Sequence, residues 1–89
     1  MGRNGRQDEA SAPRYVISVA ARLAGTTAHA LRSYEEAGLI RPARTDGRIR
    51  LYSDEDIERL RHIHSIAERG VNYAGIKVIL EMEGRRGGR

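Results

Sequence analysis

The sequence TTAHALRSYEEAGL, residues 26–39, decides how the rest of the chain is interpreted. Thr26 is a good helix N-cap, and Gly38 can adopt the left-handed conformation that commonly ends a helix. Between them, apolar residues recur at helical spacing and predict one buried face, made by Ala30, Leu31, Tyr34 and Ala37. The opposite face is small at its start and basic at Arg32. Such a face suits a DNA major groove, although a solvated amphipathic helix would have the same pattern.

A further helix is expected directly before this stretch. Ser18 is a good N-cap, and Gly25 can end the helix. Apolar residues between them repeat on one helical face, namely Val19, Ala20, Leu23 and Ala24. A helix, a turn that opens at a glycine and then a second helix is the arrangement of a helix-turn-helix unit, whose second helix reads DNA.

A short β-hairpin is predicted after the second helix. Pro42 prevents the helix from continuing, and Asp46-Gly47 is typical of hairpin turns. The segment holds the densest group of basic residues inside the ordered region, Arg41, Arg44, Arg48 and Arg50. A basic wing of this kind usually lies on the phosphate backbone or in a minor groove, and the alternative is a solvated loop.

Two more helices complete the predicted domain. Ser53 and Asp56 are spaced as a capping box, and Asn72 can cap the last helix. The expected fold is mainly α, a winged helix-turn-helix of about four helices with a small β-hairpin wing, over residues 14–83. The flanks are polar and rich in glycine. We therefore expect a disordered N-terminal arm over residues 1–13 and a flexible basic tail over residues 84–89.

The composition limits the possible functions. The chain has 89 residues, a formal net charge of +4 and a pI near 10.1. Of the 16 basic residues only Lys77 is lysine, and Arg suits phosphate and guanine geometry, although GC-rich genomes also favour it. The absence of Cys excludes disulfides and thiolate metal sites. No apolar run is long enough to span a membrane, so a cytoplasmic location is expected by default. Binding to DNA would make it nucleoid-associated.

The sequence offers no arrangement that points to catalysis. His62 and His64 are two residues apart on a predicted helix, so their side chains point to different sides and cannot share a metal ion. The serines have capping or surface roles, and no phosphate-binding loop is present. We therefore predict no enzymatic activity, no metal site and no cofactor.

Taken in order, these motifs resemble the DNA-binding domain of the mercury-resistance-regulator (MerR) family. The resemblance covers about residues 15–82. It is carried by Val16-Ile17-Ser18-Val19-Ala20, Leu31-Arg32-Ser33-Tyr34-Glu35, Arg50-Leu51-Tyr52-Ser53 and Gly70-Val71-Asn72-Tyr73-Ala74-Gly75-Ile76-Lys77. Within the family, the first and last of these segments are most similar to the heat-shock repressors of the HspR type. The nitrogen regulators of the GlnR and TnrA type are the near rival.

The resemblance implies a homodimer that binds inverted repeats in double-stranded DNA. For the heat-shock branch it further implies repression of chaperone genes, with the chaperone DnaK as co-repressor. It places DNA contacts on Thr27, His29, Arg32, Tyr34, Arg48 and Arg50. Thr26 at the helix start and Arg44 in the basic wing complete the candidate DNA-binding set.

Two other functions are consistent with the sequence. One is an architectural or excisionase-like winged-helix protein that binds DNA cooperatively without an effector. The other is a protein-interaction module that binds no DNA, and the arginine-rich wing argues against it. Inverted repeats in the bound DNA would favour a dimeric regulator, whereas direct repeats would favour the architectural protein.

Overall fold

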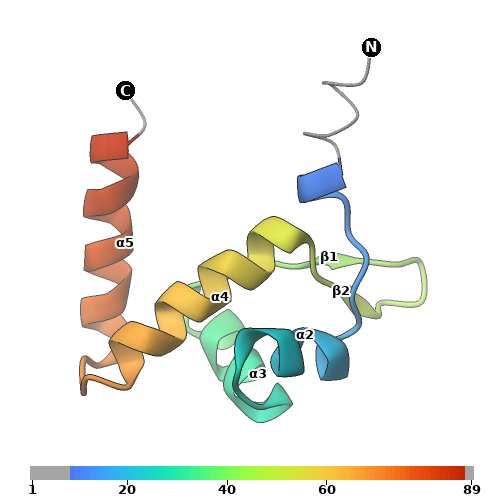
Figure 1. The fold of residues 1–89 in the computed structure, drawn as a ribbon, viewed down its shortest axis with the longest axis horizontal. Coiled ribbons are helices and arrows are strands. Elements are labelled where there is room, and N and C mark those ends of the chain that lie inside the picture. Colours follow the sequence, from blue (N-terminus) through green and yellow to red (C-terminus); the bar gives the residue numbers. More distant parts are fainter. Residues whose placement is uncertain (1–8, 88–89) are drawn as a thin grey trace.

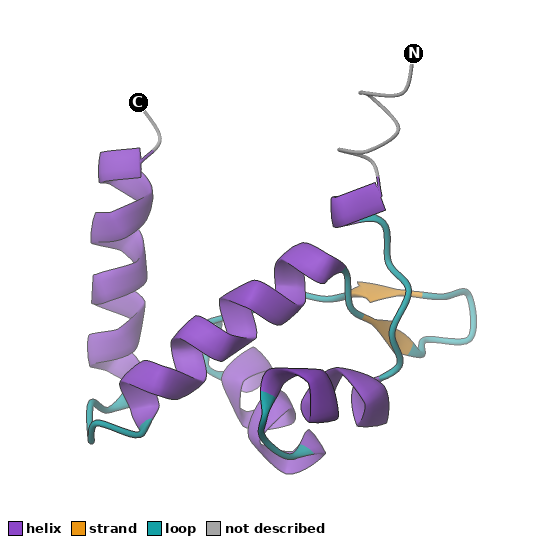
Figure 2. Cartoon of the chain, viewed as in Figure 1, coloured by secondary structure: helices purple, strands orange, loops and turns teal. Residues whose placement is uncertain are grey.

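The computed structural model describes residues 9–87, which form helices around a small hairpin (Figure 1). The order of elements is α2 (Ile17–Ala24), α3 (Ala28–Glu36), β1 (Ala43–Arg44), β2 (Arg50–Leu51), α4 (Asp54–Ala67) and α5 (Tyr73–Gly87). A helical turn at residues 9–11 precedes them. Figure 2 shows the hairpin as the β structure of a mainly helical chain. The predicted winged helix-turn-helix fold is confirmed.

Both helices of the helix-turn-helix unit begin close to the expected positions, but α2 is capped two residues earlier and α3 one residue later than expected. The N-cap of α2 is Val16, without a side-chain cap, rather than the residue before Val19. This follows because Tyr15 pairs with Tyr52 in an isolated antiparallel bridge, so the chain leaves extended pairing at Val16 and turns at once into the helix. Ser18 therefore lies inside α2, and its predicted capping role is wrong.

The cap of α3 is also shifted. Thr27, not Thr26, has the extended backbone of an N-cap, and its Oγ1 accepts a hydrogen bond from the backbone N–H of Ala30 at 3.1 Å. The N–H of Thr26 donates to the carbonyl of Ala21 at 2.9 Å, so Thr26 still belongs to the turn that closes α2. The predicted capping role of Thr26 is therefore wrong by one residue.

The other predicted helix ends are confirmed. Gly25 and Gly38 both have φ of +79°, where a residue with a Cβ is strained. Ser53 and Asp56 form a reciprocal capping box at the start of α4. The side chain of Asn72 accepts a hydrogen bond from the N–H of Gly75 at 2.8 Å, which caps α5.

The core gathers residues of α2, α3 and α4, with Tyr52 directly after β2 and Ile76 in α5 closing its edges. Figure 1 shows α4 crossing the pair α2 and α3, while α5 stands at one side of the molecule. The largest side chains that are completely buried come from five segments: Leu31, Leu39, Tyr52, Leu60, Ile63 and Ile76. The exposed face of α3 is thereby supported from behind by apolar packing.

The two flanks differ from the prediction where the structure describes them. Helix α5 continues to Gly87, into the segment expected to be a flexible tail. Residues 9–11 form a helical turn within the segment expected to be a disordered arm. The predictions for residues 1–8 and 88–89 lie outside the described residues.

Candidate nucleic-acid interface

The outward face of α3 is the first part of the candidate interface. Thr27, His29 and Arg32 are exposed, and Ala28 and Ser33 are half-buried. Leu31 and Tyr34 point the other way and are buried in the core. The expected division of this helix into a packed face and an accessible face is therefore present. Its accessible face combines a hydroxyl, an imidazole and a guanidinium, all of which can bond to base edges or phosphates.

Tyr34 is buried, with an exposed fraction of only 3%. Its hydroxyl is hydrogen bonded to Nδ1 of His64 at 2.9 Å, and its ring packs edge-on against Tyr73 with 5.6 Å between centroids. Burial raises the pKa of its hydroxyl, with smaller contributions from Tyr73 and Glu68. These contacts tie α3 to α4 and α5. They argue against direct contact between this side chain and DNA, because its hydroxyl already has a partner inside the protein.

The wing is held to α3 by one carboxylate, that of Glu35. Arg44 Nη2 donates to its Oε2 and Arg50 Nε donates to its Oε1, both at 2.6 Å. The two arginines face each other in the antiparallel register of β1 and β2. The exposed side-chain fractions are 20% for Glu35, 28% for Arg50 and 41% for Arg44. Two of the four arginines that suggested a phosphate-binding wing are thus engaged within the protein.

The electrostatics of this group follow from its geometry. Burial raises the pKa of the Glu35 carboxyl, but the hydrogen bonds and charges of Arg50 and Arg44 outweigh burial and hold the pKa below its ordinary value. The hydrogen bond to Glu35 correspondingly raises the pKa of Arg50. The carboxylate and both guanidiniums are therefore charged at neutral pH, with a combined charge of one positive unit.

The tip of the wing presents Arg48. Its backbone has φ of +65°, the left-handed conformation that glycine usually takes in a hairpin loop of this length. The N–H of Arg48 donates to the carbonyl of Thr45 at 2.8 Å, and Thr45 Oγ1 accepts from the N–H groups of Gly47 and Ile49, both at 3.2 Å. The predicted turn at Asp46-Gly47 is confirmed. The turn places an arginine at its most strained position.

Three exposed arginines near this surface make no hydrogen bond or ion pair through their side chains with any residue between 9 and 87. They are Arg32 on α3, Arg41 before β1 and Arg48 at the wing tip. Other arginines are engaged in the fold. Arg59 donates to the carbonyl of Leu39 at 2.9 Å, and Arg61 donates to that of Leu23 at 3.1 Å. The arginines therefore fall into two groups: those whose side chains are available to bind phosphate, and those whose side chains stabilise the fold.

The sequence prediction of the site left out two residues that the structure brings to it. Glu35 was missed because its partners lie 9 and 15 residues away, so no local pattern reveals the pairing. Arg41 was recognised as part of the basic segment but not included in the site, although it is exposed. Its position directly before Pro42, at the base of the hairpin, was the available signal.

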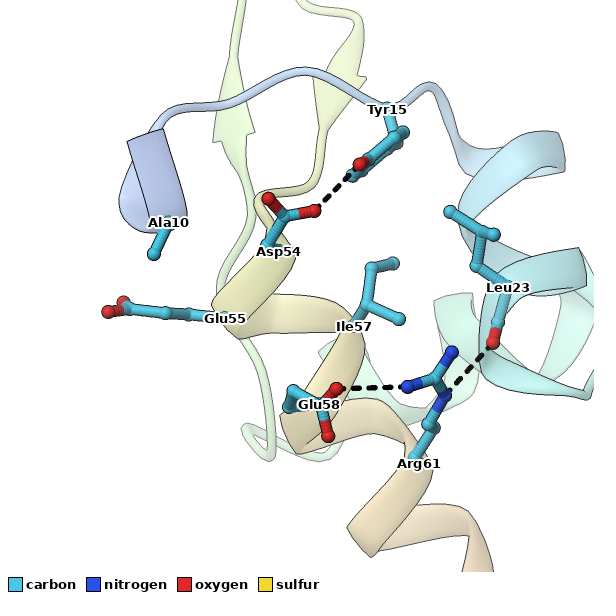
Figure 3. Close-up of a pocket in the computed structure, with 8 residues that line it drawn as sticks. All are labelled: Ala10, Tyr15, Leu23, Asp54, Glu55, Ile57, Glu58 and Arg61. Carbon is cyan, nitrogen blue, oxygen red and sulfur yellow. Dashed lines mark hydrogen bonds and ion pairs between the residues drawn. The ribbon is translucent and has the colours of Figure 1, made fainter. Parts of the chain in front are cut away.

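A separate hollow of about 370 Å³ lies between α2, α4 and the segment before α2 (Figure 3). Three acidic side chains border it: Asp54, Glu55 and Glu58. Tyr15 donates to Oδ1 of Asp54 at 2.6 Å, and Arg61 Nη1 donates to Oε2 of Glu58 at 2.9 Å. The acidic border makes this hollow unsuitable for phosphate. Across residues 9–87, no cluster of three or more His, Cys, Asp or Glu is arranged to hold a metal ion.

A helix-turn-helix with an accessible basic face, followed by a basic hairpin wing, defines a winged helix-turn-helix protein of the DNA-binding class. The family described as "MerR HTH family regulatory protein" matches residues 15–83. The chain belongs to this family, which confirms the resemblance seen in the sequence. No described helix is both long enough and apolar enough to cross a membrane.

Similar proteins are transcriptional regulators and a heat shock protein. The chain is 51% identical over 72 residues to HspR of Streptomyces coelicolor, which is named as a heat shock protein; the match covers 80% of this chain and 48% of HspR. It is 38% identical over 78 residues to the HTH-type transcriptional regulator GlnR of Bacillus anthracis, covering 88% of this chain and 60% of GlnR. It is 47% identical over 53 residues to the regulator YfmP of Bacillus subtilis, covering 58% of this chain and 38% of YfmP. The chain thus spans about half the length of these relatives.

Proposed function

We propose that this chain binds DNA in a sequence-specific manner as a transcriptional regulator and that it represses heat-shock and chaperone genes. Membership of the MerR family and 51% identity to HspR support this function. The structural observation that carries the DNA-binding part is the joint exposure of Arg32 on α3 and Arg48 on the wing, both without an internal partner among residues 9–87. Two unpaired guanidiniums on the elements that contact DNA in this fold are suited to bases and phosphates.

Helix α3 would enter the major groove with its N-terminal half. Thr27 and His29 lie in its first turn, and Arg32 follows about one turn later on the same accessible face. Arg32 is the best candidate for a guanine, because its planar group can donate two parallel hydrogen bonds. Thr26 lies directly before the helix, where hydroxyl and backbone N–H groups commonly meet phosphate.

The wing would lie on the phosphate backbone. Arg48 at its tip and Arg41 at its base are the main candidates for phosphate contact. Arg44 and Arg50 remain in the proposed interface as secondary donors, because each uses only part of its guanidinium on Glu35. Tyr34 is proposed to support α3 from the core instead of touching DNA.

The oligomeric state, the cellular location and the co-repressor are proposed from the resemblance to the heat-shock branch. The chain would act as a homodimer on inverted repeats, in the cytoplasm and associated with the nucleoid. The chaperone DnaK would serve as co-repressor. No cofactor, metal or enzymatic activity forms part of this proposal.

The decisive experiment is selection of bound DNA from a random pool, with the number of chains per complex measured in the same samples. We expect an inverted repeat bound by two chains, with half-sites upstream of chaperone genes. The variant Arg32→Ala should lose about 1–3 kcal/mol of binding to the selected site and much less to random DNA.

Arg85→Ala is the matched control, because Arg85 is exposed near the end of α5, away from α3 and the wing. It removes the same charge and should weaken binding to both DNAs alike. Direct repeats bound by a growing ladder of chains would instead support the architectural alternative. A pool without any enriched sequence would contradict sequence-specific binding.

A further inference from the structure

One carboxylate connects the recognition helix to both strands of the wing. Glu35 belongs to the last turn of α3, and its two oxygens accept separate hydrogen bonds from Arg44 on β1 and Arg50 on β2. The two strands are only two residues each, and their residues are exposed or half-buried. Apolar packing therefore contributes little within the strands themselves, whereas buried Ile40 and Tyr52 anchor the base of the hairpin. The two charge-assisted bonds at 2.6 Å are the main direct links between α3 and the hairpin strands among the described residues.

The same arginine that reaches Glu35 also reaches the wing tip. Arg44 uses Nη2 for the carboxylate and Nη1 for the carbonyl of Arg48, at 3.3 Å. Arg48 has a left-handed backbone, which is unfavourable for a residue with a Cβ and persists only when neighbouring contacts hold it. A continuous path thus runs from Glu35 through the guanidinium of Arg44 to the backbone of Arg48.

We propose that Glu35 is a positioning residue for DNA binding, which acts through Arg44 to hold Arg48 at a fixed place relative to Arg32. This inference rests on the proposed function, in which Arg32 and Arg48 contact the same DNA. Two contacts on separate elements add to specificity only when the elements keep a fixed geometry before binding, because otherwise the wing must be ordered during binding.

Removal of Glu35 is expected to change DNA affinity in the direction opposite to that predicted from its charge alone. Glu35 is a negative charge on the surface that meets DNA, so simple electrostatics predicts that its removal tightens binding to every DNA. If Glu35 positions the wing, its removal must weaken binding to the selected site. At the same time it frees Arg44 and Arg50, which should strengthen binding to random DNA.

The test compares Glu35→Gln with the unaltered chain. Dissociation constants are measured for the selected duplex and for a random duplex at several salt concentrations. We expect the ratio of specific to random affinity to fall by about tenfold, the size expected when one or two long side chains must be ordered on binding. The slope of log affinity against log salt on random DNA should become steeper.

The matched control is Glu36→Gln, which removes the same charge one residue later on the same helix. Glu36 is exposed and makes no hydrogen bond or ion pair with residues 9–87, and it acts on Arg50 only through its charge. This variant should bind both DNAs slightly more tightly, with an unchanged ratio. If Glu35→Gln behaves in the same way as Glu36→Gln, the positioning role is overturned and Glu35 is only a surface charge.

A double-mutant cycle tests whether the effect passes through Arg48. In an Arg48→Ala background, Glu35→Gln should cause little further loss of the specific-to-random ratio. A full, additive loss there would overturn the path through Arg44. Circular dichroism and thermal unfolding of each variant exclude loss of folding as the cause.

The two proposals fail in different ways. If the unaltered chain discriminates between sequences and Glu35→Gln discriminates equally well, only the positioning role is wrong. If the unaltered chain binds all sequences alike, the proposed function is wrong and the positioning role falls with it. A rise in binding to the selected site on removal of Glu35 also overturns the positioning role.

Discussion

The packed helices and the wing bury very different amounts of side chain. Leu31, Leu60 and Ile63 are fully buried between α2, α3 and α4, whereas Ile49 in the wing is 55% exposed. The helices are therefore stabilised by the burial of apolar side chains, a large contribution that does not depend on the exact direction of the contacts. The wing is positioned by hydrogen bonds and ion pairs, which are weaker in water but fix direction and distance. A DNA-binding domain of this design separates the forces that fold it from those that orient its contacts.

The largest expected effect comes from the helical core. Leu60→Ala should lower the free energy of unfolding by about 2–5 kcal/mol, because it leaves a cavity at a fully buried position of α4. Ile49→Ala in the wing removes similar apolar atoms from an exposed position and should change the free energy of unfolding by less than about 0.5 kcal/mol. Urea unfolding followed by circular dichroism measures both.

Because a domain of this size is only marginally stable, a loss at the upper end of this range leaves too little folded Leu60→Ala to measure. Leu60→Met then serves as a milder variant, with a loss below about 1.5 kcal/mol because it nearly conserves volume. Equal losses at Leu60 and Ile49 would contradict the contrast between the two regions.

The helical region was also the more predictable of the two. The glycines that end α2 and α3, and the capping box at Ser53, act through residues one to four positions away, so the sequence reveals them directly. The errors there were small, and one had a local cause and the other a distant one. Thr26 remained in the preceding turn, and the pairing of Tyr15 with Tyr52 shifted the start of α2.

The candidate site was predicted less completely, because its organisation depends on distant residues. The arginine-rich wing was evident, but whether each arginine faces solvent or Glu35 depends on how β1, β2 and α3 meet. Tyr34 was the subject of two predictions, as a core residue by its spacing and as a DNA contact by resemblance. Its burial against Tyr73 and its bond to His64 favour the core role.

A smaller effect is expected at the wing tip. Arg48 has φ of +65°, where a Cβ costs about 1–2 kcal/mol relative to glycine. Arg48→Gly should therefore unfold at a higher urea concentration than Arg48→Ala, by a free-energy difference of about 1 kcal/mol after allowing for the greater chain entropy of glycine. Both variants lose the same guanidinium, so both should lose the same affinity for DNA.

Comparing these two variants separates strain from charge. If Arg48→Ala is as stable as Arg48→Gly, the turn relaxes without cost and the left-handed backbone stores no strain. If Arg48→Ala, Arg48→Gly and the unaltered chain are equally stable, the wing tip contributes nothing to the stability of the fold. Either outcome would sharpen the contrast with the core, where each buried side chain matters.

The smallest expected effect is a dependence of stability on pH that belongs to the wing. Arg50 and Arg44 hold the pKa of Glu35 below its ordinary value of 4.5, despite the opposing effect of burial. A carboxyl whose pKa is lower in the folded state stabilises that state above its unfolded pKa, and this contribution disappears as the pH falls through the folded-state pKa. The unaltered chain should therefore lose more stability than Glu35→Gln between pH 7 and acidic pH.

The difference should be below about 1 kcal/mol, since the ion pairs are partly exposed. Urea unfolding of both proteins across this range measures it, and the remaining carboxylates cancel because both proteins contain them. Parallel curves would mean that the ion pairs orient the wing without stabilising the fold, whereas a larger loss would place Glu35 among the residues on which folding itself depends.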